Sequence, residues 1–178
     1  MLRLNGFNVL GVEPDLKSIE KSNQLFLENN LDKNLIYNGF AEDLPFEDNS
    51  FDYVISYQVL EHVNSLDKTF QEIERVLDVG GMTFNICPNY NSFYEGHFRL
   101  FMLPSMSKDN FKKYLRFINM LSLKKKDVKS INDSVNSLNF IKPKDIYNVN
   151  KKLSKLQIRE EDGGLLRFEN NKLVIWSR

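Results

Sequence analysis

The chain has 178 residues, 42% of them hydrophobic, and a net charge of zero at pH 7. These values are typical of one globular domain with a sizeable buried core. No run reaches the roughly 18 apolar residues of a membrane span, and the N-terminal residues lack the features of a signal peptide. We therefore expect a cytoplasmic protein without a membrane span.

Cysteine and histidine are too scarce to suggest redox or metal chemistry. The one cysteine, Cys87, cannot form an internal disulfide, and the apolar run MTFNICP around it favours a core residue over a nucleophile. The two histidines, His62 and His97, lie far apart, and no paired-cysteine or His-Glu-x-x-His spacing occurs. We therefore expect no metal site.

The first predicted element is the end of a helix, because Leu2 to Leu4 are followed by Gly6, a residue favoured at helix C-termini. The run FNVLGVE (7–13) suits a buried parallel strand. A helix then begins at Pro14–Asp15 and ends near Asn29–Asn30. It is followed by LIYNGFAEDL (35–44), a strand that runs into a loop.

The middle of the chain continues the alternation of strand and helix. A buried strand is predicted at Tyr53–Ser56, a helix at Leu66–Leu77 stopped by Gly80–Gly81, and a third buried strand in MTFNICP, ended by Pro88. This order predicts an α/β fold with a mostly parallel, Rossmann-like sheet.

The pattern changes after Asn89. An aromatic loop, a basic helix near Asp109–Leu121, a polar linker and a helix started near Pro143 follow in turn, so we interpret 90–150 as an insertion or cap within a single domain spanning 1–178. The C-terminal runs are separated by the turn dipeptides Asp162–Gly163 and Asn170–Asn171, which predict an antiparallel hairpin.

Charge is unevenly spread along the chain. Residues 12–78 contain 15 acidic and 5 basic side chains, whereas residues 108–129 contain 8 basic and 2 acidic ones. The basic segment is either a solvated helix face or a contact for an anionic substrate or membrane surface. Nucleic acid is not an expected partner, because the cluster is confined to one segment and no recognised module accompanies it.

Ligands of open α/β sheets bind beyond the carboxyl ends of the strands, so the residues just after each predicted strand are candidates for the site. Glu13 ends the first strand, where a carboxylate can accept two hydrogen bonds from a ribose diol or, alternatively, can favour the following helix N-terminus. The other candidate segments are Ala41–Asp43, Ser56–His62 and Pro88–Asn91.

A resemblance to a known family rests on several motifs in order. The run AEDLPFEDNSFDYVISYQVLEHV (41–63), with GVEPD upstream and VLDVGGMTFNICPN downstream, resembles the middle of class I S-adenosylmethionine-dependent methyltransferases. This resemblance covers residues 1–89. More loosely, PNYNSFYEGHFRLFMLP and FIKPKDIYNV are similar to a subgroup associated with polysaccharide and lipopolysaccharide biosynthesis. A saccharide or another small hydroxylated acceptor is the implied substrate.

The resemblance implies roles for particular residues. Glu13 would hold the ribose of S-adenosylmethionine, Ala41 and Glu42 would border the adenine, and Phe40 stands where many relatives have aspartate, with Glu42 a possible substitute. At the methionine end of the cofactor and at the acceptor, the implied residues are Ser56, Tyr57, Gln58, Asn89, Tyr90 and Tyr94.

Methyl transfer to a hydroxyl would benefit from a general base. His62 and His97 are the candidates, although His62 can instead tie a helix start to a backbone carbonyl and His97 can be a surface residue. The aromatic residues around Tyr90 would form a wall over the acceptor or pack the cap onto the sheet, and the sequence does not separate these two interpretations.

The family's glycine-rich cofactor loop and the strand before it have no counterpart in the sequence. We interpret this as truncation, which would leave two strand edges unpaired in the middle of the sheet. An alternative function is a non-catalytic, methyltransferase-like binding or scaffold module that has lost the cofactor. A third, a dehydrogenase, also has an acid after its second strand, but the LPF, SFD and LEH series argues against it.

Overall fold

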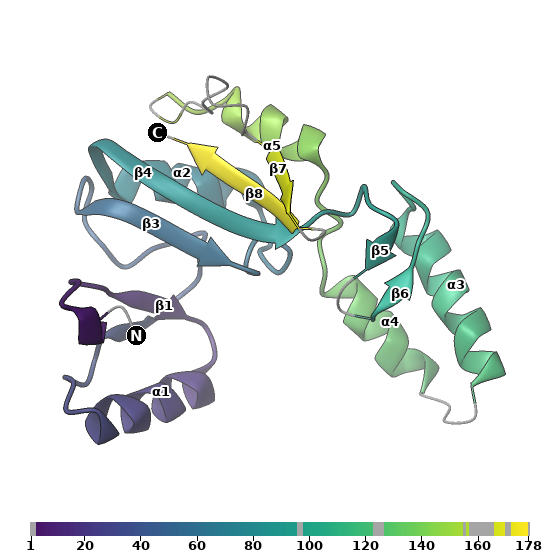
Figure 1. The fold of residues 1–178 in the computed structure, drawn as a ribbon, viewed down its shortest axis with the longest axis horizontal. Helices are drawn as coiled ribbons and strands as arrows, with labels where there is room; N and C mark the ends of the chain where they lie inside the picture. The colour runs from purple at the N-terminus through teal and green to yellow at the C-terminus, as the bar shows by residue number, and fades with distance from the viewer. Residues whose placement is uncertain are drawn as a thin grey trace.

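A computed structural model describes residues 3–95, 98–122, 127–154 and 156, and the backbone of 166–169 and 172–177. Its described strands fall into three sheets, and helices pack beside them (Figure 1). The chain enters through a short 3₁₀ helix, η1 (Arg3–Asn5), that ends at Gly6 with φ of 85°. A positive φ favours glycine, so the predicted helix end at this position is confirmed.

The first layer pairs two short parallel strands, β1 (Gly11–Glu13) and β2 (Ile36–Asn38), which are joined by helix α1 (Leu16–Glu28). Asp15 caps α1, because its carboxylate accepts hydrogen bonds from the Lys17 and Ser18 backbone amides. These elements match the predicted strand, helix and strand, although both strands are shorter than predicted.

The main sheet has the order β3–β4–β8–β7. Strand β3 (Phe51–Tyr57) is parallel to β4 (Leu77–Pro88), which pairs antiparallel with β8 (Lys172–Ser177), and β8 in turn pairs with β7 (Leu166–Glu169). The predicted parallel strand pairs, β1–β2 and β3–β4, and the predicted C-terminal antiparallel hairpin are thus present, although the main sheet itself is mixed. The sheet is divided, however, because β1 and β2 form a separate sheet from β3 and β4 (Figure 1).

Helices cover one face of the main sheet. Helix α2 (Leu66–Val76) and helix α5 (Pro143–Asn150) pack together, and their apolar side chains form the first core with residues from β3 and β4. The buried members of this core are Leu60, Phe70, Ile73, Leu77, Cys87, Ile141, Ile146, Val149 and Leu156.

The opposite face of β3 and β4 is apolar and exposed. Tyr53, Ile55 and Tyr57 of β3 are paired in register with Met82, Phe84 and Ile86 of β4, and all three β3 side chains are exposed. Alternate residues of a strand point to opposite faces, and parallel sheets are normally covered on both.

A second core lies in the segment after β4. A small ribbon of β5 (Tyr94–Glu95) and β6 (Leu100–Phe101) leads into helix α3 (Lys108–Leu121), and α3 packs against α4 (Val128–Asn136). The prediction of a polar linker after the basic helix is wrong for residues 128–136, which are helical. Helix α4 forms there because Asp127 caps it and because Ile131 and Val135 are buried.

Candidate functional site

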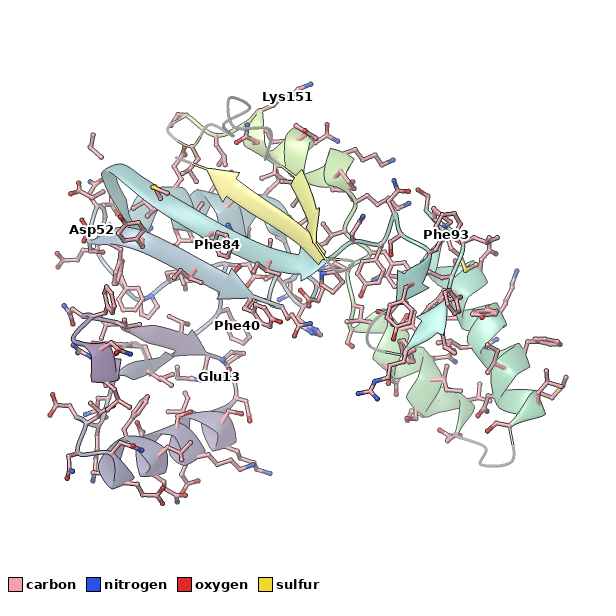
Figure 2. The ribbon with its side chains drawn as sticks, viewed as in Figure 1. Glu13, Phe40, Asp52, Phe84, Phe93 and Lys151 are labelled. Carbon is pink, nitrogen blue, oxygen red and sulfur yellow. The ribbon has the colours of Figure 1, made fainter. Side chains whose placement is uncertain are left out.

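The predicted site residues follow the carboxyl ends of β1, β2 and β3. Glu13 ends β1, Phe40 follows β2, and both labelled side chains lie at the same end of that sheet (Figure 2). Asp52 lies at the start of β3, away from the end where Ser56 and Tyr57 lie.

Glu13 is held by local hydrogen bonds. One carboxylate oxygen, Oε1, accepts from the Asp15 backbone N at 2.9 Å. The Asn38 side-chain amide donates to the carbonyls of Glu13 and Pro14 at 3.1 and 3.0 Å. The end of β1 is therefore fixed to the end of β2, and the Glu13 carboxylate is held where these two strands finish.

Glu42 has a structural partner that the sequence did not suggest. Its Oε1 accepts hydrogen bonds from the backbone N of Asn64 and of Ser65, the latter at 3.2 Å. Ser65 is the N-cap of α2, so Glu42 also satisfies backbone donors at the beginning of that helix. The neighbouring Ala41 is half-buried and Phe40 is exposed.

Arg75 of α2 fixes the acidic loop in which Ala41 and Glu42 lie. Its guanidinium donates to the carbonyls of Leu44 and Phe46 at 3.0 and 2.8 Å, and to the carboxylates of Glu72 and Asp48 at 2.7 to 2.9 Å. The hydrogen bond from Arg75 holds the pKa of Glu72 below its usual range. The sequence pattern did not single out Arg75, and the available signal was that it is the only arginine among residues 12–78.

At the end of β3, successive residues have different surroundings. Ser56 donates to Asn85 Oδ1 at 2.6 Å, and Asn85 Nδ2 donates to Thr83 Oγ1 at 2.9 Å, so Ser56 belongs to a polar chain on the helix-covered face. Tyr57 is on the exposed face. Gln58 has φ of 55°, and its backbone N donates to the Ile86 carbonyl at 2.7 Å. A left-handed backbone at a non-glycine residue is costly and is found at ligand sites more often than elsewhere.

The residues after β4 are more enclosed than the predicted acceptor role suggests. Asn89 is buried, and its side-chain oxygen accepts from the Asn91 backbone N at 2.9 Å. Tyr90 is 1% exposed, stacks on Phe140 at 4.3 Å between ring centroids, and donates its hydroxyl to Glu95 at 3.4 Å. Tyr94 is partly exposed and packs edge-to-face on Phe101. Tyr90 is therefore observed to pack in the second core.

Of the two histidines proposed as general bases, the structure describes only His62. His62 is exposed, and its backbone N donates to the Val59 carbonyl at 2.8 Å in the turn that follows β3. His97 lies outside the described residues. The only described candidate base is thus His62, which lies just beyond the end of β3.

Two buried carboxylates near this end of the sheet were not predicted. Glu61 is fully buried, and Glu95 is 2% exposed and accepts from the Phe98 backbone N at 2.7 Å. Burial and these carboxylates raise the pKa of Tyr90, which is therefore neutral at physiological pH. The sequence signal for Glu61 was an acidic residue directly after the apolar residues Val59 and Leu60.

Cys87 is expected to be unreactive. It is fully buried, and burial, with a smaller effect of Glu61, raises the pKa of its thiol to about 12. About one thiol in ten thousand would then be ionised at pH 8, and the thiolate is the reactive form. Alkylation by iodoacetamide should be much slower in the folded protein than in guanidinium. Equal rates in both conditions would contradict this burial.

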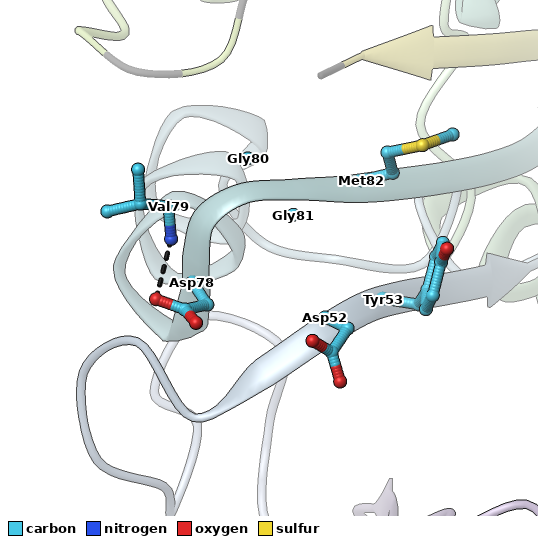
Figure 3. Close-up of a pocket in the computed structure, with 7 residues that line it drawn as sticks. All are labelled: Asp52, Tyr53, Asp78, Val79, Gly80, Gly81 and Met82. Carbon is cyan, nitrogen blue, oxygen red and sulfur yellow. Dashed lines mark hydrogen bonds between the residues drawn. The ribbon is translucent and has the colours of Figure 1, made fainter.

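A shallow pocket of about 180 Å³ lies elsewhere, at the beginning of β3 (Figure 3). It arises because β4 bulges between Leu77 and Met82, with φ of 81° at Gly80. A Cβ on Gly81 would lie 3.0 Å from the Asp78 carbonyl oxygen and 3.1 Å from the Asp52 carbonyl oxygen, so a side chain at this position would crowd the backbone. The pocket is at the end of β3 remote from Ser56 and Tyr57, so it is not part of the candidate site.

The chain is similar to several known proteins. Residues 1–84 match the methyltransferase domain family. The sterol 24-C-methyltransferase erg6 of Schizosaccharomyces pombe is 37% identical over 78 residues, which are 43% of this chain and 21% of that protein. The chain thus spans about a fifth of this curated relative.

Solved structures share the fold. The PH0226 protein of Pyrococcus horikoshii has a TM-score of 0.62 and 18% identity, over 99% of this chain and 74% of that one. Phosphoethanolamine N-methyltransferase 2 of Haemonchus contortus, solved in complex with S-adenosyl-L-methionine, has a TM-score of 0.55 and 20% identity over 83% of this chain and 27% of that one. No described helix is long and apolar enough to cross a membrane.

Proposed function

We propose that this protein is a class I S-adenosylmethionine-dependent methyltransferase that takes part in methyl transfer to a saccharide or another small hydroxylated acceptor, because residues 1–84 match the methyltransferase domain family. The observation that carries the proposal is the placement of Glu13 and of the loop that begins at Phe40 at the same end of the β1–β2 sheet. In parallel sheets, ligands bind at this end.

The residues present fit part of the cofactor. Glu13 has one oxygen engaged with Asp15, and its other oxygen would accept a hydrogen bond from the ribose. Ala41 and Glu42 border the adenine in this proposal, with Glu42 held toward α2 by Asn64 and Ser65. When bound, the cofactor supplies an electrophilic methyl group on sulfur, and Tyr57 and Gln58 would flank that end.

The acceptor would bind between the end of β3 and the cap. His62 is the described residue that would take the proton from an acceptor hydroxyl, and residues 90–150 would exclude water. Because Tyr90 packs in the cap core, its contribution is to hold the loop that contains Asn89 and Tyr94. The acceptor contacts would then come from Asn89 and Tyr94.

We also propose that the site needs a further parallel strand and its glycine loop, supplied by a segment outside this sequence. Two observations support this: β1 and β3 each pair on one edge among the described strands, and Tyr53, Ile55 and Tyr57 are exposed. Unpaired edges and apolar sheet faces favour another layer of polypeptide. In-frame codons for a strand and a Gly-x-Gly loop upstream of Met1 would support truncation, and an early stop without them would exclude it.

Calorimetric titration with S-adenosylhomocysteine separates the enzyme from the alternative scaffold module. Micromolar binding by the 178-residue chain supports the enzyme as it stands. Binding only by a chain extended with the upstream codons supports the truncation proposal. Absence of binding to both chains at millimolar ligand favours the non-catalytic module.

The variant Glu13→Gln tests the proposed ribose contact, in whichever of the two chains binds S-adenosylhomocysteine. The variant keeps the side-chain shape but loses the charge, and a hydrogen bond to a charged group is worth about 1.5–3 kcal/mol. We expect the affinity for S-adenosylhomocysteine to fall at least about tenfold. The matched control is Glu28→Gln, at the exposed C-terminal end of α1, which should leave the affinity unchanged. Equal affinities of wild type and Glu13→Gln would refute the ribose role.

A further inference from the structure

Helix α3 has two separate apolar stripes. The first, which includes Phe111 and Leu115, is buried against α4 in the second core. The second consists of Phe117, Met120 and Leu121, which are 57%, 61% and 67% exposed. Because these three residues follow the i, i+3, i+4 spacing, they share one face of the helix. The exposed stripe therefore does not contribute to the core between α3 and α4.

The exposed stripe lies near the free end of the hairpin. Helices α3 and α4 extend together away from the main sheet (Figure 1). Leu121 ends α3, and Val128, also exposed, begins α4. We define the hairpin tip as the exposed side chains of Lys113, Phe117, Met120, Leu121, Val128 and Lys129 in the two helices.

Basic side chains accompany the apolar ones on this surface. Lys113 precedes Phe117 by one turn and is exposed, as is Lys129 in the first turn of α4. Arg116 is also exposed and donates to Asn132 Oδ1 at 2.9 Å, which links α3 to α4. A charge of +6 is concentrated in residues 108–129, although the whole chain is neutral. The remaining residues therefore carry −6.

Exposed apolar side chains together with basic ones indicate the chemical class of the partner. A soluble anion or a nucleic acid would be bound by the charges alone, without exposed phenylalanine, methionine and leucine. An anionic bilayer uses both, because apolar side chains enter the headgroup region while lysines pair with lipid phosphates. We propose that the hairpin tip docks this protein on an anionic lipid bilayer. The proposal does not depend on methyl transfer.

The orientation follows from the charges. The acidic segment 12–78 contains α1 and α2 and belongs to the sheet region, whereas the tip projects from it (Figure 1). An anionic surface would repel the acidic segment and attract the tip, so the protein would contact the bilayer by its hairpin end. Screening by salt should weaken the attraction of the lysines and leave the apolar contribution.

Vesicle flotation tests the proposal with the full chain, because aggregated protein sediments whereas vesicle-bound protein floats. The wild type should float with phosphatidylcholine vesicles that contain phosphatidylglycerol and should not float with phosphatidylcholine alone. The triple variant Phe117→Ser, Met120→Ser and Leu121→Ser should reduce the bound fraction at least about tenfold. These side chains are exposed, so circular dichroism should show the fold unchanged.

Two further variants make the result specific. Lys113→Glu with Lys129→Glu should also reduce flotation, and this reduction should be smallest at high salt. The matched control, Leu25→Ser with Leu27→Ser, removes exposed apolar side chains from α1 and should leave flotation unchanged. The proposal is overturned by absence of flotation with anionic vesicles, by equal loss in the α1 control, or by full binding of the triple variant. The last outcome would instead indicate that the basic side chains alone bind the vesicle surface.

Discussion

Phe111→Ala should destabilise the protein by about 3–5 kcal/mol, the cost of removing a fully buried aromatic ring from a packed core. Phe111 is 0% exposed. It packs edge-to-face on Phe98 and on Phe140, each at 5.6 Å between ring centroids, and contacts Tyr114 at 6.2 Å. For a chain of this length the midpoint of thermal unfolding should fall by roughly 6–20 °C.

The matched control is Phe117→Ala, which makes the same change on the same helix. Phe117 is exposed, and so the variant should change stability by less than about 0.5 kcal/mol. Hydrogen exchange would add a local readout, with protection lost first in α3 and α4 of the Phe111 variant. If both variants had the same stability, the second core would not be what holds α3 and α4 together.

The second core also contains aromatic residues that follow β4. The sequence left open whether they form a wall over an acceptor or pack the cap. The structure places Tyr90 and Phe98 with Phe111 in the second core, whereas Phe93 is exposed. Aromatic residues bury large areas in either role, so composition alone does not separate the two. The distinction depends on contacts with Phe140, which lies far along the chain.

Local patterns predicted most of the elements correctly. Helix α2 was expected at Leu66–Leu77 and is found at Leu66–Val76, because Ser65 caps it and one apolar face is buried. The strand expected at 82–88 coincides with the part of β4 that is regularly paired from Met82 onward. Helix α4 was missed because its nine residues contain few apolar positions.

Side-chain partners in the candidate site were harder to predict. The position of Glu42 after β2 follows from the strand pattern, but its contact with Asn64 and Ser65 crosses more than 20 residues. Likewise, the predicted place of Ser56 at the methionine end of the cofactor follows from the strand pattern, but its hydrogen bond to Asn85 does not. Strand order places residues at one end of a sheet, whereas rotamers and tertiary contacts decide which way each side chain turns.

Arg75→Ala should release the acidic loop that borders the proposed adenine site. The Arg75 side chain is 30% exposed, and its guanidinium donates hydrogen bonds to carbonyls or carboxylates of four residues in the loop and in α2. Hydrogen bonds to charged groups contribute about 1.5–3 kcal/mol, and partial exposure reduces the electrostatic share. We expect a loss of about 2–3 kcal/mol in urea unfolding.

The controls separate the geometry of the guanidinium from its charge. Arg75→Lys keeps the charge but lacks the planar fork, so it should recover less than half of the loss. Lys152→Ala removes an exposed ion pair to Asp67 at 2.7 Å and should cost less than about 0.5 kcal/mol. If Arg75→Ala were as mild as Lys152→Ala, the loop would be held by other contacts.

The dependence on pH identifies the partner of Arg75. The hydrogen bond from Arg75 lowers the pKa of Glu72 in the folded protein, so the unfolded chain binds a proton at this residue first as pH falls. The stabilisation is complete above the ordinary pKa of about 4.5 and is lost as pH falls through the folded value. As the pH falls below 5, the free energy of unfolding of Arg75→Ala should therefore decrease less than that of the wild type. Urea unfolding at each pH measures this difference. An identical pH dependence would mean that Glu72 is not the residue through which Arg75 holds the loop.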